Sequence, residues 1–113
     1  MPKEIQIKAR VIVQLDGENL LGPGRVRLME KIQSTGSIAE AAREMGISYR
    51  KALRLINCIN DQFENDVILT WKGGTDYGGA KLSESGQKLI DQYREMLKRV
   101  DLVLEEEASR FSQ

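Results

Sequence analysis

The chain has 113 residues, which predicts one compact domain over residues 1–113. Its 17 basic and 17 acidic residues give a formal net charge of zero, and no apolar run approaches the roughly 20 residues of a membrane-spanning helix. There is no histidine and only one cysteine, so histidine-dependent catalysis, ordinary zinc sites and internal disulfides are excluded, and we expect a cytoplasmic protein that is not an enzyme and holds no metal or cofactor.

The first predicted element is a β-hairpin over residues 1–21. Apolar side chains recur at every second position and would share one face of a strand, namely Ile5, Ile7, Ala9, Val11, Val13 and Leu15. Asp16-Gly17 follows, and this pair is typical of a tight hairpin turn in which both residues need positive φ. We therefore expect a strand with one buried side and a short return strand over residues 18–21.

A helix is predicted after the Gly-Pro-Gly sequence at residues 22–24, because proline fits the first turn of a helix. Its buried face would consist of the apolar residues at helical spacing, Val26, Leu28, Met29 and Ile32. The Thr-Gly pair at residues 35–36 is expected to end it.

Two short helices joined by a glycine turn form the most specific pattern in the sequence. Ser37 would cap the first helix, with Glu40 completing a capping box, and Ser48 would cap the second helix after the turn at Gly46. The inner faces carry small and apolar residues, namely Ile38, Ala41, Ala42, Met45, Ile47, Ala52, Leu55, Ile56 and Ile59. Together these features predict a helix-turn-helix, the alternative being a helical hairpin with no role in nucleic-acid binding.

The second of these helices carries a local excess of positive charge, because residues 48–60 contain basic side chains and no acid. The face opposite the core would present Tyr49, Arg50, Leu53, Arg54 and Asn57. In a helix-turn-helix this face enters the major groove, where arginine reads guanine and asparagine reads adenine. Ser48 and Lys51 suit phosphate contacts, and Ser37 is also expected to contact DNA. The alternative for each arginine is an ordinary solvated side chain. Cys58, beside this face, is expected to be half-buried rather than a redox switch.

A second hairpin is predicted from the β-prone run at residues 67–71, the glycine-rich loop that follows, and the return strand at residues 80–82. Trp71 is expected in the core or against the last helix. The loop would form a wing that reaches the DNA backbone or minor groove through Lys72, Gly73, Gly74, Thr75, Tyr77 and Lys81. The alternative is a disordered hairpin tip.

The last predicted helix begins after Ser83, lies within residues 83–113 and runs for about 27 residues, or near 40 Å, which exceeds the roughly 30 Å width of a small domain. Apolar residues at alternating spacings of four and three form a seam, Leu89, Tyr93, Met96, Val100 and Val103. We predict that this seam pairs with the same helix of a second chain and forms a homodimer. The alternative is a helix folded back over its own domain.

The segment GPGRVRLMEKIQSTGSIAEAAREMGISYRKALRLINCIN and the later GGTDYGGAKLSESGQKLIDQYR, within residues 22–94, resemble the N-terminal DNA-binding domain of the molybdate-responsive transcriptional regulators (ModE type). The stretch from Gly36 resembles, more distantly, the LysR-type helix-turn-helix. The resemblance implies a winged helix over residues 23–82, a homodimer held by N- and C-terminal elements, and operator binding by the helix at residues 48–60 and the wing. No counterpart of the C-terminal molybdate-binding module of larger members is expected here, nor another small-molecule ligand.

The sequence thus predicts a mainly α protein with a small β component: a winged helix-turn-helix with an N-terminal hairpin and a long C-terminal dimerisation helix. Its predicted function is regulation of transcription through sequence-specific binding of double-stranded DNA, with no membrane partner. One alternative is a winged helix used as a protein-interaction module, whose basic face meets an acidic partner. Another is a small enzyme, which would lack histidine, metal ligands and an activated nucleophile.

Overall fold

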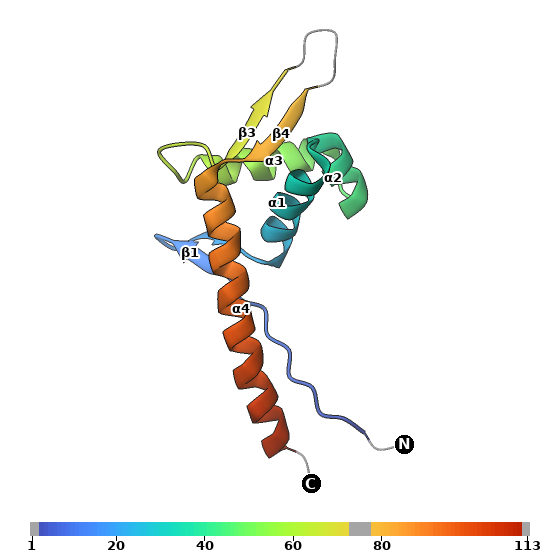
Figure 1. The fold of residues 1–113 in the computed structure, drawn as a ribbon, viewed down its shortest axis with the longest axis vertical. Helices are drawn as coiled ribbons and strands as arrows, with labels where there is room; N and C mark the ends of the chain where they lie inside the picture. Colours follow the sequence, from blue (N-terminus) through green and yellow to red (C-terminus); the bar gives the residue numbers. More distant parts are fainter. Residues whose placement is uncertain (1–2, 73–77, 112–113) are drawn as a thin grey trace.

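The computed structural model describes residues 3–72 and 78–111. Along the chain the elements are β1 (Val13–Leu15), β2 (Glu18–Leu21), α1 (Pro23–Thr35), α2 (Ile38–Met45), α3 (Tyr49–Asn60), β3 (Ile68–Trp71), β4 (Gly79–Leu82) and α4 (Glu84–Arg110). Strands β1 and β2 form one antiparallel pair, and β3 and β4 form another. The prediction of a mainly α protein with two small hairpins and a long C-terminal helix is confirmed. In Figure 1 the β3–β4 hairpin and the far end of α4 project in opposite directions from the α1–α3 region.

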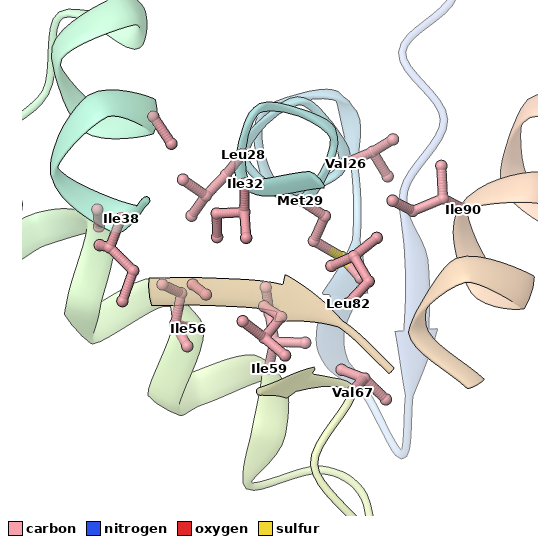
Figure 2. Packing of buried hydrophobic residues seen from close by; sticks show 14 of the residues in the cluster. Val26, Leu28, Met29, Ile32, Ile38, Ile56, Ile59, Val67, Leu82 and Ile90 are labelled. Atoms are coloured by element: carbon pink, nitrogen blue, oxygen red, sulfur yellow. The ribbon is translucent and has the colours of Figure 1, made fainter. Parts of the chain in front are cut away.

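Helix α1 forms the centre of the core. Pro23 occupies its first turn, and Gly36 ends it with a φ of 71°, a conformation that glycine adopts without strain. The predicted inner residues Val26, Leu28, Met29 and Ile32 are completely buried. Figure 2 shows α1 between α2 and α4, with Ile38 approaching from α2 and Ile90 from α4, while Ile56 and Ile59 of α3 lie toward the side where β4 runs.

The β3–β4 hairpin is tied to the helices by backbone groups outside its own ladder. The Ala80 amide donates to the Gly36 carbonyl (3.0 Å), and the Leu82 amide donates to Gln33 Oε1 (3.1 Å). Asn60, at the end of α3, accepts from the Ile68 amide (3.0 Å) and donates to the Ile68 carbonyl (2.9 Å). The Asn60 bonds connect the base of the hairpin to the end of α3, and the Ala80 and Leu82 bonds connect it to the end of α1.

The N-terminal strand is shorter than the alternating pattern predicts. Strand β1 begins at Val13, residues 3–12 form no strand, and Ile5 is 47% exposed. The predicted turn is present, with positive φ at Asp16 (50°) and Gly17 (82°). The predicted long strand is wrong because a strand needs a neighbour to complete its hydrogen bonds, and the return strand stops at Leu21, where α1 begins.

Two side-chain predictions are also wrong. Trp71 is 49% exposed, because alternation along β3 turns Ile68 inward and therefore places Leu69 and Trp71 on the outer face. The Trp71 ring covers Gly79 on the paired strand, where a Cβ atom would lie 2.2 Å from Trp71 Cζ2. Cys58 is exposed rather than half-buried, since α3 turns Ile56 and Ile59 inward instead.

The capping box at the start of α2 forms only in part. Ser37 Oγ accepts from the Glu40 amide (3.2 Å), as predicted. The Glu40 carboxylate does not return the bond, because it pairs with Arg43 (2.6 Å), and the Ser37 amide donates to Thr35 Oγ1 instead (3.3 Å). The hydrogen bond from Arg43 and its positive charge hold the pKa of Glu40 below its ordinary value.

Helix α4 packs on the domain with its first half only. Ile90 and Tyr93 are buried, and Tyr93 Oη donates to the Val11 carbonyl (2.8 Å). In the second half Leu102 and Val103 are 61% and 55% exposed. The molecule is therefore elongated, 63 Å in its longest dimension. No helix in the described part of the chain has the length and hydropathy to span a membrane.

Gly86 marks a close approach of α4 to Val67, the residue before β3. A Cβ atom at this position would lie 2.3 Å from the Val67 carbonyl oxygen, which is held in place by the Ser83 amide (2.9 Å). We expect Gly86→Ala to lower the free energy of unfolding by about 1–3 kcal/mol through overpacking, more than the roughly 1 kcal/mol that alanine gains in helix propensity. In thermal unfolding followed by circular dichroism, Tm should fall by roughly 4–12 °C.

The matched control is Gly24→Ala, also in the first turn of a helix, where a Cβ atom would meet nothing within 4 Å. Its Tm should stay the same or rise. An unchanged Tm for Gly86→Ala would show that the backbone at Val67 shifts at little cost to make room for the new Cβ atom.

Candidate nucleic-acid interface

The turn between α2 and α3 sets the angle of the two helices. Gly46 has a φ of 69° and donates to the Arg43 carbonyl (3.1 Å), and the Ile47 amide donates to the Ala42 carbonyl (3.0 Å). Ala42 is 2% exposed, which fits the small side chain required where the helices approach. Ser48 Oγ then accepts from the Lys51 amide (3.0 Å) and starts α3. These local bonds fix α3 relative to the core.

Helix α3 has one face in the core and one in solvent. Ala52, Ile56 and Ile59 are buried. Four of the five residues predicted to face the major groove are exposed, namely Tyr49, Arg50, Arg54 and Asn57, and so is Lys51, which was predicted to contact phosphate. Leu53, expected among them, is half-buried and packs against the core, as does Leu55 from the other side. The structure therefore brings the predicted polar set together on a single exposed helix surface.

Charge pairing differs sharply between α2 and α3. On α2, Glu40 pairs with Arg43, and Glu44 pairs with Lys31 (3.0 Å). On α3, the side chains of Arg50, Lys51 and Arg54 make no ion pair or hydrogen bond with the rest of the described chain. The acids beside the turn are neutralised while the cations of α3 are not, so this surface is positive although the whole chain is neutral.

Both capping serines retain donor capacity. Ser37 and Ser48 use their hydroxyl oxygens to accept backbone amides at the starts of α2 and α3. Their hydroxyl hydrogens remain able to donate to an oxyanion such as phosphate, as the predicted contact requires.

The hairpin β3–β4 stands beside α3, with its free end directed away from α4 (Figure 1). Lys72 and Lys81 are exposed, one after β3 and one on β4. The other predicted wing contacts, Gly73, Gly74, Thr75 and Tyr77, lie outside the described residues. The exposed Trp71 adds an aromatic surface near this end of the hairpin. The two-residue period of a strand, counted from the inward-facing Ile68, could have predicted that Trp71 faces outward.

The predicted dimerisation seam is divided by the structure. Tyr93 is buried in its own chain, and Leu89 and Met96 are half-buried against the same core. Val100 is half-buried and Val103 is exposed. The first half of the seam thus serves the fold of its own chain, and pairing with a second copy stays a prediction that concerns the second half of α4.

Nothing in residues 3–72 and 78–111 groups three or more histidine, cysteine, aspartate or glutamate side chains in a way that could hold a metal ion.

No family model matches the chain. It is 39% identical over 82 residues to the molybdenum-pterin-binding protein MopA of Rhodobacter capsulatus, covering 73% of this chain and 31% of that protein. It is 35% identical over 89 residues to the transcriptional regulator ModE of Yersinia pestis, and 34% identical over 89 residues to the DNA-binding transcriptional dual regulator ModE of Escherichia coli (strain K12), in each case covering 79% of this chain and 34% of the relative. The chain thus spans about a third of the length of the curated relatives it matches. The predicted resemblance to ModE-type proteins is confirmed at this level, and the names of these relatives describe transcriptional regulators and a molybdenum-pterin-binding protein.

Proposed function

We propose that this chain is a ModE-like, sequence-specific DNA-binding regulator of transcription with a winged-helix fold. The observation that carries the proposal is the pair Arg50 and Arg54, exposed and unpaired on a helix whose opposite face is locked into the core. An arginine with no protein partner, held on a rigid element, is prepared for bidentate recognition of an acceptor pair. The similarity to regulators named ModE supports the same function.

In this proposal α3 lies in the major groove of double-stranded DNA. Arg50 and Arg54 are one helical turn apart and each donates to O6 and N7 of a guanine, and Asn57 addresses an adenine further along. Lys51 and Ser48, with the free amides at the start of α3, hold phosphates and set the register of the helix.

The hairpin β3–β4 acts as the wing. Its base is fixed to α3 through Asn60, so the wing and the reading helix approach DNA as one body. Lys72 and Lys81 contact the backbone beside the groove that α3 occupies.

The second half of α4 pairs with its counterpart in a second chain and places two reading helices on one two-fold axis. Leu102 and Val103 are exposed there and would be buried by such pairing. Sedimentation velocity at micromolar concentration should give a dimer of the 12.8 kDa chain. Val103→Glu should shift it to monomer, whereas Gln92→Glu, at an exposed position of the first half of α4, should not. A wild-type monomer would contradict the pairing.

In-vitro selection of bound duplexes from a random pool tests the proposed function directly. We expect enrichment of a two-fold symmetric site with half-sites separated by about one helical turn, roughly 10–10.5 base pairs. The double variant with Arg50→Ala and Arg54→Ala should retain weak binding and lose the enriched motif. A pool that shows no enrichment with the wild-type protein would instead favour a module that binds an acidic protein.

A further inference from the structure

A cavity of about 370 Å³ lies beside the helix-turn-helix, on the side of the N-terminal hairpin. Its apolar wall comes from Ile12 and Leu21 of the hairpin region, Met45 and Ile47 around the α2–α3 turn, and Leu55 of α3. The volume lies within the range of small-molecule sites, about 300–1,000 Å³. The cavity therefore offers a concave apolar surface for a ligand where the hairpin region, the α2–α3 turn and α3 meet.

The polar part of the wall is entirely basic or neutral. Arg10, Arg25 and Lys51 line the cavity together with Asn19, and no carboxylate does. None of the three cations forms an ion pair with another described residue. Cations gathered at one cavity without an anion repel each other, and an anionic ligand would relieve that repulsion.

Arg25 is held in place and still has donors to offer. Its Nη1 atom donates to the carbonyls of Asn19 (2.6 Å) and Leu20 (3.4 Å), which fixes the guanidinium at the wall. Its other N–H groups make no hydrogen bond within the described chain. The Asn19 side chain accepts from Gln14 Nε2 (3.0 Å) through its oxygen, so its amide group is free to donate. Pre-positioned donors of this kind suit a carboxylate.

We propose that this cavity binds a small organic carboxylate with an apolar body, and that binding weakens the affinity of α3 for DNA. The apolar wall takes the body and the Arg10–Arg25–Lys51 cluster takes the carboxylate. The second half of the proposal rests on the proposed function: Lys51 faces both the cavity and the DNA surface, so a bound anion neutralises a phosphate contact and adds negative charge beside the reading helix. No such ligand is suggested by the sequence, because the residues that line the cavity come from two separate stretches of the chain, residues 10–25 and 45–55.

Benzoate is a suitable probe ligand. Benzyl alcohol, which lacks the charge, and sulfate, which lacks the apolar body, are the control compounds. In titrations of the full chain followed by ¹H–¹⁵N NMR, benzoate should shift the amides of Leu21 and Ile47 saturably. Benzyl alcohol and sulfate should bind at least about tenfold more weakly at equal ionic strength. No saturable shift with benzoate, or an equal response to benzyl alcohol, overturns the assignment.

Two variants locate the site on the cationic wall. Arg10→Gln and Arg25→Gln should each weaken benzoate binding by about tenfold, as expected for the loss of a charge-assisted hydrogen bond. The control is Arg27→Gln, on the same helix as Arg25, exposed and outside the cavity. Arg10 makes no hydrogen bond or ion pair within the described chain, so its variant tests the site even if Arg25→Gln affects folding. Equal benzoate affinity in Arg10→Gln and Arg27→Gln would overturn the proposal.

The coupling to DNA has a separate readout. A benzoate concentration that just saturates the wild type should weaken its binding of the selected duplex several-fold, and at the same concentration Arg10→Gln should show a clearly smaller loss. By linkage, DNA should weaken benzoate binding by the same factor. Benzoate binding without any change in DNA affinity would overturn the coupling while leaving the site intact. Absence of DNA binding in any condition would count against the proposed function and leave the NMR result to judge the cavity.

Discussion

The affinity of the protein for its preferred duplex should fall by roughly 10³–10⁵ between 50 and 200 mM salt, as expected when a dimer neutralises about 6 to 10 phosphates. The salt dependence arises because basic side chains of each protomer displace counterions from the DNA phosphates, namely Arg50, Lys51, Arg54, Lys72 and Lys81. The net charge of the whole chain is zero, so the chain as a whole supplies no general attraction for DNA. Fluorescence anisotropy of a labelled duplex across this salt range gives the slope of log affinity against log salt.

Single substitutions can show which residues contribute to the slope of log affinity against log salt. Lys51→Gln should lower the magnitude of this slope by about one for each phosphate contact that is lost. Lys88→Gln is the control, since Lys88 is an exposed cation of α4 that lies 3.7 Å from Glu84 and is not among the residues proposed to contact DNA. A shallow slope with weak binding to every duplex would remove DNA as the partner and favour an acidic protein surface.

Arg54→Ala should cost about 1–3 kcal/mol on the preferred duplex, a loss of roughly 5- to 150-fold, and should relax selectivity at one base pair. The reason is that a bidentate contact to guanine discriminates against the other bases, whereas a phosphate contact does not. Lys51→Ala should weaken binding by the same factor for every duplex, whatever its sequence. Anisotropy titrations of the selected duplex and of its single-base variants separate the two patterns.

Neither substitution should change the stability of the fold enough to affect this comparison. Arg54 and Lys51 are exposed, and their side chains make no ion pair or hydrogen bond among the described residues. The free energy of unfolding of each variant should therefore lie within about 0.5 kcal/mol of the wild-type value. Arg27→Ala, at an exposed position of α1, serves as the matched loss of charge. If Arg54→Ala lowered affinity equally for every sequence, Arg54 would contact only the DNA backbone.

The features that the sequence determined by itself are those set within a few residues. Ser37, Ser48 and Ser83 each cap a helix by accepting a hydrogen bond from the backbone amide three residues later. Gly36 and Gly46 end helices at positive φ. The two faces of α3 follow from a period of 3.6 residues and needed no knowledge of what the inner face packs against. The two short helices, the glycine turn between them and the exposed polar surface of α3 were therefore predictable.

Tertiary structure decided whatever depended on a distant neighbour. Residues 3–12 alternate in hydropathy like a strand but have no strand to pair with in the described chain. Tyr93, predicted in the dimer seam, is instead buried in its own chain, where its hydroxyl donates a hydrogen bond to the carbonyl of Val11, far away in sequence. Asn60 ties α3 to β3 through an amide that no local pattern distinguishes. Periodicity reports which residues share a face, whereas burial and pairing depend on which segment comes to cover that face, and only the folded chain settles this.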